Sequence, residues 1–212
     1  MIFSVSRGLI KPWKQVVYFD FDSDMKKNLL LPLIRISEEY GCKVRGFVCD
    51  MGNKALLREL GVKINKWNYF IPNPVEPSRS VYIFPDMPHC IKLLRNHTLD
   101  EGMVIKCPNN NTVYLNKDHF LDLISSDGDE WKLVYKVSLA HLEVRGMERQ
   151  RVRPAMQLFS HTVSQAFLQV FGKKYVDQSK IIERVDAWVD VMNSRQGYDW
   201  KKNRCGLGEN EI

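Results

Sequence analysis

Short runs of β-branched and aromatic residues alternate with longer amphipathic stretches along the first hundred residues. Runs of the first kind are typical of buried strands, whereas apolar residues spaced three or four apart predict helices. The expected strands cover residues 2–5, 16–21, 43–49 and 81–84. Expected helices cover residues 25–40 and 53–60, and a third helix begins at Asp86. This alternation predicts an α/β fold with a largely parallel sheet.

The stretch 81–97 organises this half of the chain, because an apolar run leads through Asp86 directly into a helix. Asp86 occupies a favourable N-cap position, and His89 follows three residues later, so a carboxylate and an imidazole leave the strand tip together. We expect Lys92 and Arg95 on the outer face of the helix. Asp86 and His89 either cap and pack this helix or belong to a functional site, and the pattern alone favours the structural role.

Helical patterns dominate the second half, which follows a polar connection rich in asparagine. We place the boundary between two domains, residues 1–100 and 117–212, in the linker 101–116. A small hairpin is expected inside this linker, at residues 104–105 and 113–115. The expected helices of the second domain cover residues 119–124, 130–142, 154–171 and 178–194.

Composition narrows the class of protein only moderately. The 212 residues carry a formal charge of +6, which favours a polyanionic partner without specifying one. The five cysteines are odd in number and form no CxxC pair, so a reducing compartment fits best. No signal peptide and no apolar stretch of membrane-spanning length are visible, so no membrane partner is expected.

Asp50 is the first candidate for chemistry, because it directly follows the strand 43–49 and precedes Gly52 and the helix 53–60. Open α/β folds present functional carboxylates at this edge of the sheet. The alternative is that Asp50 is a turn residue or a helix cap. The chain has no GxxxxGK[ST] motif and no glycine-rich cradle, so any nucleotide site would depend on single side chains.

Several short motifs occur in a fixed order along nearly the whole chain. They are Gly8-Leu9 with Trp13-Lys14-Gln15, Cys49-Asp50-Met51-Gly52, Asp86-Met87-Pro88-His89, the helix from Lys92 to His97, Phe159-Ser160, and the segment from Asp190 to Arg195. With these motifs the chain resembles the P-element transposases and their THAP9-type relatives. The resemblance implies a partial RNase H-like catalytic sheet in the first domain. It implies the N-terminal part of a mainly α-helical, GTP-binding insertion domain in the second.

The resemblance also implies metal-dependent DNA cleavage and strand transfer, in which carboxylates hold two divalent ions, Mg²⁺ or Mn²⁺. Asp50 matches the second of three catalytic carboxylates in this family and would be a metal ligand. The other two are expected upstream of Met1 and downstream of Ile212, so we expect a fragment that is inactive alone. Asp86 and His89 match a D-x-x-H element that supports the active site without being one of the three metal ligands.

For the nucleotide, the family match points to Asp190, whose carboxylate can accept hydrogen bonds from the N1 and N2 donors of guanine. Asn193 lies about one helical turn further on and could support it. The match adds four residues, namely Lys136 and Arg151 for phosphates and Val152 and Ser160 for the pocket wall. Without the resemblance, the two cations are ordinary exposed surface charges.

Two functions follow from these expectations. The first is a fragment of a P-element-like transposase, located in the nucleus, with GTP, transposon-end DNA and other transposase subunits as partners. The second is a domesticated or truncated protein without catalysis, which binds DNA or intact transposase and acts as a repressor. An unstable translation product without a role is a third possibility, and whether the chain itself is an enzyme is left open.

Overall fold

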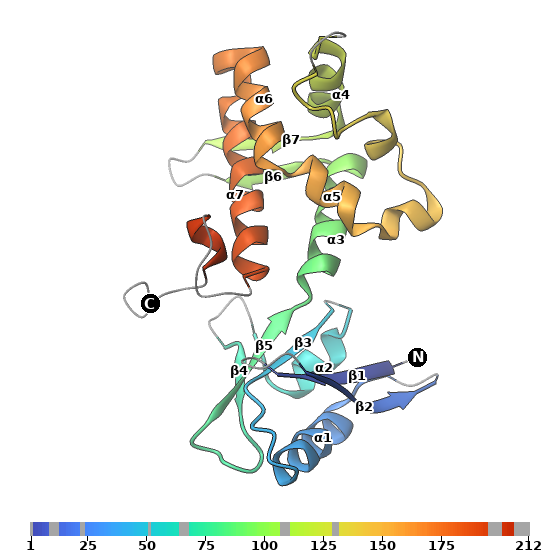
Figure 1. Ribbon diagram of the computed structural model, residues 1–212, viewed down its shortest axis with the longest axis vertical. Helices are drawn as coiled ribbons and strands as arrows, with labels where there is room; N and C mark the ends of the chain where they lie inside the picture. The colour runs from blue at the N-terminus through green and yellow to red at the C-terminus, as the bar shows by residue number, and fades with distance from the viewer. Residues whose placement is uncertain are drawn as a thin grey trace. The chain divides into compact units, whose positions relative to one another are not determined.

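The computed structural model describes residues 2–8, 13–21, 24–50, 52–63, 68–106, 111–128, 132–194 and 201–205. The chain divides into two compact units, Met1–Asp86 and Met87–Ile212, each with its own hydrophobic core (Figure 1). The motif residues Leu9, Met51 and Arg195 lie outside the described residues. None of the helices within the described ranges is long and apolar enough to cross a membrane.

The first unit is mixed α/β and contains two small sheets. Strands β1 (Ile2–Arg7) and β2 (Lys14–Asp20) form an antiparallel hairpin. Strands β3 (Gly46–Cys49), β5 (Ser80–Pro85) and β4 (Phe70–Pro72) form the second sheet in that order.

The α/β class is confirmed, but the prediction of a largely parallel sheet is wrong. Among the described strands only β3 and β5 pair in parallel, while β4 pairs antiparallel with β5. The three-residue strand β4 is too short to give a periodic pattern, and β1 pairs locally with β2 because a hairpin needs no crossover.

Two helices cover one face of the three-stranded sheet, α1 (Lys27–Glu39) and α2 (Lys54–Glu59). Strand β5 alternates, so that Val81 and Ile83 are buried while Tyr82 and Phe84 are exposed on the opposite face. The core residues shared by helices and sheet are Leu30, Ile34, Cys49, Leu56, Ile71, Val81 and Ile83. The unit therefore has one packed face, and the carboxyl ends of β3 and β5 lie at the same edge of the sheet.

The second unit is mainly helical (Figure 1). Its main elements are α3 (Met87–Asp100), the hairpin β6 (Met103–Lys106) and β7 (Thr112–Leu115), α4 (Lys117–Ser126), α5 (Val152–Leu158), α6 (His161–Phe171) and α7 (Val176–Met192). Helices α6 and α7 pack against each other, and the Phe120 ring meets the Phe159 and Phe167 rings edge-on in the core. The predicted hairpin is confirmed, whereas the domain boundaries remain predictions.

Two predicted helices are wrong. The helix expected at 154–171 is two helices, because Ser160 adopts an extended conformation and caps α6 by accepting a hydrogen bond from the Val163 N–H at 3.4 Å. The helix expected at 130–142 has no α-helical turn in its described part. There, the Asp127 carboxylate accepts hydrogen bonds from the backbone of Leu133 and Val134, which holds a tight turn in place.

A buried ion pair joins the helix α1 to the segments around β3 and β5. The Arg79 guanidinium donates to both oxygens of Glu38, at 3.0 Å and 2.6 Å, and the same carboxylate accepts from the Val44 N–H and from the Asn73 amide. The hydrogen bonds from Arg79 outweigh the opposing effect of burial and lower the pKa of Glu38 from 4.5 to about 2. Glu38 therefore stays ionised across the pH range in which most carboxylates titrate.

We expect Glu38→Gln to lower the midpoint of thermal unfolding of the first unit at pH 7, because it removes the charge that Arg79 faces. The contribution of Glu38 is complete above pH 4.5 and disappears as the pH falls from 4.5 toward 2. The difference between wild type and variant should therefore narrow over this interval, as followed by circular dichroism. Glu39→Gln, an exposed neighbour on α1, is the matched control, and a difference independent of pH would contradict the assignment.

Candidate functional site

Asp50 lies immediately after β3, exposed at the carboxyl edge of the three-stranded sheet. Its Oδ1 atom accepts hydrogen bonds from the Gly52 N–H at 3.1 Å and from the Asn53 side-chain amide at 3.0 Å. The carboxylate is thus held by its own turn, as the alternative interpretation expects, and it also presents hard oxygen atoms to solvent.

Asp86 follows the neighbouring parallel strand, β5, so the structure brings it to the same edge as Asp50. Cys49 and Pro85 are paired in register, and the Asp86 N–H donates to the Cys49 carbonyl at 2.8 Å. Burial, and to a smaller extent the charges of Asp50 and Asp86, raise the pKa of the Cys49 thiol to about 11. The thiol is therefore protonated at neutral pH, and the edge of the sheet is a local concentration of negative charge.

These residues suit a divalent cation in their chemistry but form an incomplete site. Asp86 directly precedes α3, and His89 is the third residue of that helix. The part of the chain that the structure describes contains no group of three or more His, Cys, Asp and Glu side chains placed to hold a metal ion. Asp50 and Asp86 could supply oxygen ligands to a cation that other groups complete.

In the second unit, Asp190 lies near the C-terminal end of α7 with its side chain only 8% exposed. Its Oδ1 accepts from Arg204 Nε at 2.8 Å, and its Oδ2 accepts from Lys201 Nζ at 3.0 Å. Burial alone would raise the pKa of Asp190, but the hydrogen bonds from Arg204 and Lys201 lower it. The carboxylate is therefore ionised, and its two oxygens face two cations.

The start of α6 lies beside a second carboxylate of α7. Asp186, one turn before Asp190 on α7, is 3.9 Å from Lys201 Nζ and also accepts a backbone hydrogen bond from His161. Burial, the largest effect, raises the pKa of Asp186 despite these contacts. Because His161 directly follows Ser160, the predicted residue Ser160 lies next to a residue that contacts α7 one helical turn before Asp190.

The remaining predicted nucleotide residues are more dispersed. Asn193 is the exposed C-cap residue of α7, and Val152 is the half-buried first residue of α5. Lys136 is exposed, with its ammonium 5.1 Å from the ring centre of Tyr135. Within the described residues, no hydrogen bond or ion pair joins Lys136 to Asp190, so the structure does not bring the whole predicted set together.

Arg95 corrects one expectation, because it is completely buried and not on the outer face of α3. Its guanidinium donates to the carbonyl groups of Arg149 at 2.7 Å and Arg151 at 3.3 Å, and to the Asn96 side chain at 2.9 Å. The amphipathic pattern missed this position because a charged residue is normally solvated. Arg95 therefore holds the backbone that presents Arg151 and Val152.

Sequence reasoning also missed Lys201 and Arg204, which close on Asp190 from beyond the end of α7. The acidic residues Asp186 and Asp190, one helical turn apart, were the available signal, since two carboxylates on one buried face require nearby donors. The two cations lie outside the helix that carries the carboxylates, so no helical spacing in the sequence indicated that these residues pair.

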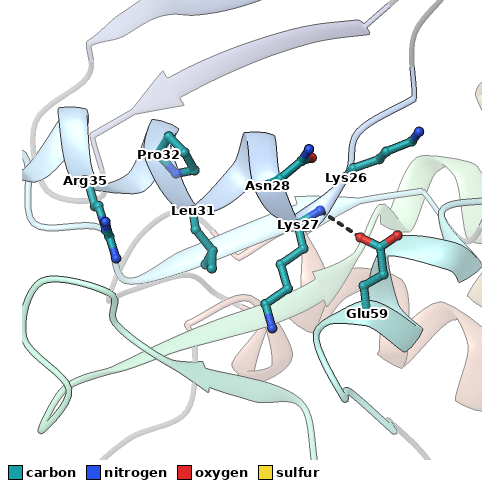
Figure 2. A pocket seen from close by; sticks show the side chains of 7 residues that line it. All are labelled: Lys26, Lys27, Asn28, Leu31, Pro32, Arg35 and Glu59. Carbon is teal, nitrogen blue, oxygen red and sulfur yellow. Dashed lines mark hydrogen bonds between the residues drawn. The ribbon is translucent and has the colours of Figure 1, made fainter.

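A shallow, open depression of about 570 Å³ lies beside the N-terminal end of α1 (Figure 2). Its lining residues are Lys26, Lys27, Asn28, Leu31, Pro32, Arg35 and Glu59. The Lys27 N–H donates to Glu59 at 3.0 Å, which ties α2 to the first turn of α1. None of the predicted site residues lines this depression.

Three comparisons place these observations among known proteins. The model of the "TNP-like, GTP-binding insertion domain" family matches residues 88–204. The chain is 30% identical over 200 residues to the "Transposable element P transposase" of Drosophila melanogaster, a match that covers 91% of this chain and 26% of that protein. It is also similar to a chain of the solved "Drosophila P element transposase strand transfer complex", with a TM-score of 0.83, 27% identity, and coverage of 95% of this chain and 46% of that one.

We expect Arg95→Met to destabilise the second unit by about 2 kcal/mol, because the carbonyl groups of residues 149 and 151 lose their buried donor. Backbone amides around residue 151 should exchange with solvent faster than in wild type. Hydrogen exchange read by mass spectrometry, together with urea unfolding, measures both effects. Arg153→Met, on the exposed side of α5, is the control, and equal exchange in the two variants would refute the anchoring role.

Proposed function

This chain belongs to the TNP-like family with a GTP-binding insertion domain, and we propose that it is part of a P-element-like DNA transposase whose second unit binds GTP. The resemblance to P-element transposases is confirmed by the family match, the relative and the solved structure. The chain spans about a quarter of the length of the curated relative and under half of the solved chain. The activity of such a whole protein is accordingly part of the proposal.

The observation that carries the GTP proposal is the buried, ionised carboxylate of Asp190 inside the matched region. A buried carboxylate requires donors, and guanine offers two adjacent ones, N1–H and N2–H, where adenine does not. In the proposed complex these donors replace at least one of the two cations that now face Asp190. Asn193, Ser160 and Val152 would border the base and ribose, while Lys136 and Arg151 would reach the phosphates.

For the first unit we propose an RNase H-like role in metal-dependent DNA cleavage and strand transfer. Asp50 would be one ligand of a pair of divalent ions, Mg²⁺ or Mn²⁺, which activate the attacking oxygen and stabilise the leaving one. Asp86 would support this edge of the sheet, and His89 keeps the supporting role in the active site that the resemblance implies. The position of Asp50 and Asp86 at the ends of two parallel strands supports the proposal, since such folds present carboxylates there.

From the resemblance we propose two partners, DNA at the transposon ends and other transposase subunits. We propose the nucleus as the location. The basic charge of +6 is consistent with a nucleic acid partner. We further propose that this polypeptide alone does not cleave DNA, because Asp50 is one of three required carboxylates. A chain that binds GTP or a transposase without cleaving DNA would act as a repressor, which is the second candidate function.

We expect Asp190→Asn to weaken GTP binding by about tenfold or more, because an amide offers one acceptor oxygen and turns a donor toward the guanine N2 donor. The same variant should prefer xanthosine triphosphate, whose C2 carbonyl accepts a hydrogen bond from the new amide. Calorimetric titration with GTP, ATP and xanthosine triphosphate measures both changes. Asp177→Asn, on the exposed first turn of α7, is the control, and an unchanged order of the three nucleotides in Asp190→Asn would contradict the role.

We expect substoichiometric Mn²⁺ to broaden the backbone amide NMR signals of residues around Asp50 and Asp86, because both carboxylates lie at this edge of the sheet. Asp50→Asn should abolish most of the broadening there. Asp24→Asn removes an exposed carboxylate elsewhere in the same unit and should leave it intact. The same broadening in wild type and Asp50→Asn would eliminate Asp50 as a metal ligand.

A further inference from the structure

The segment 201–204 contacts the end of α7 through a compact set of ion pairs. Lys201 Nζ lies 3.0 Å from Asp190 Oδ2 and 3.9 Å from Asp186 Oδ2, while Arg204 Nε lies 2.8 Å from Asp190 Oδ1. Two cations thus occupy the positions from which a guanine base would donate to Asp190. Because the Asp190 side chain is only 8% exposed, little room is left around its two oxygens, and a guanine base could approach them only by displacing a cation, so the two arrangements compete.

We propose that segment 201–204 is a nucleotide-displaced latch, which pairs with Asp190 in the absence of GTP and is released when guanine takes its place. This inference rests on the proposed GTP function and adds to it a competitor within the chain. The latch keeps the buried carboxylate satisfied until the ligand arrives, because a buried charge without donors is strongly destabilising.

The exposed fractions of Asp190, Lys201 and Arg204 indicate that the two cations can be displaced from the carboxylate and need not cover it permanently. Asp190 is 8% exposed, whereas Lys201 is 29% and Arg204 is 41% exposed. The carboxylate must always be paired, but each cation can return to water at little cost, as is usual for ion pairs at a surface. The free energy by which the latch stabilises the nucleotide-free chain is subtracted from the binding free energy of GTP.

Asp186 provides a second position for one of the cations. It lies one turn from Asp190 on the same helix, and Lys201 already approaches both carboxylates. When guanine pairs with Asp190, Lys201 can remain at Asp186 without leaving the surface of α7. Arg204, which has an ion pair with Asp190 at 2.8 Å, is therefore the cation whose release should accompany nucleotide binding.

The first test measures affinity with the full chain. Arg204→Met should bind GTP about tenfold more tightly than wild type, because a competing charge-assisted hydrogen bond is removed while Asp190 is retained. Fluorescence titration with N-methylanthraniloyl-GTP measures the change, and Arg184→Met, an exposed arginine on α7, is the control. Equal or weaker binding by Arg204→Met overturns the latch, since the segment would then support the nucleotide or ignore it.

The second test follows the latch itself by limited trypsin digestion. Wild-type chain should be cut after Lys201 and Arg204 faster with GTP than with ATP, and Asp190→Asn should be cut faster without any nucleotide. Asp177→Asn should match wild type. If Asp190→Asn does not change the rate of cleavage at these two sites, the contact is not a latch, whether or not GTP changes that rate in the wild type.

Failure of the latch and failure of the proposed function give different results. GTP binding that is equal in wild type and Arg204→Met, together with unaccelerated cleavage, removes the latch and leaves the GTP proposal standing. If neither wild type nor Arg204→Met binds GTP, the proposed function fails and the latch fails with it. Unfolding temperatures of the variants that match wild type show that the comparison concerns folded protein.

Discussion

A charged group that is removed from water must be surrounded by partners, and this requirement shapes both units of the chain. Glu38, Arg95 and Asp190 are each nearly or fully buried, and each is paired with groups distant in sequence. Glu38 ties α1 to the segments around the sheet through Arg79. Removing one partner from such a set leaves a buried charge unpaired, which is why these few residues influence so much of the structure.

The buried charges also determine where irregular backbone can be stable. Helices and strands satisfy their own polar groups, whereas the segment before α5 cannot. The guanidinium of Arg95 supplies the missing donors to its carbonyl groups, and the carboxylate of Asp127 does the converse for the N–H groups of Leu133 and Val134. The segment before α5, which has two 3-10 helices (Leu139–His141 and Gly146–Gln150) but no α-helix in its described part, is therefore held by two charged side chains, and it carries residues proposed to contact the nucleotide.

The parts that could be predicted from sequence are those governed by local rules. The apolar run before Asp86 and the helix after it were expected from proline, capping and periodicity. Gly61 closes the turn that follows α2, where a φ of +72° favours glycine. The order of short motifs along the chain indicated the family. The position of Asp50 at a strand end followed from the same local pattern.

The parts that could not be predicted depend on distant pairing. Strand β4 forms only because β5 is beside it, and Arg95 is buried only because the carbonyl groups of residues 148, 149 and 151 accept from it. Ser160 interrupts a stretch whose apolar spacing is continuous, because its hydroxyl caps a new helix. The cations that close on Asp190 come from a segment that has no pattern linking it to α7.

In the proposed metal site, the turn at Asp50 would lower the entropy cost of binding an ion. Because Gly52 and Asn53 hold one carboxylate oxygen, the side chain loses its rotational freedom when the chain folds and not when a cation arrives. The entropy of ordering that ligand is thus absent from the binding step, as in any preorganised site. A glutamate at this position would carry the same charge, but it would add a rotatable bond and lose the turn. Its carboxylate would therefore not be preorganised, and binding an ion would cost more conformational entropy.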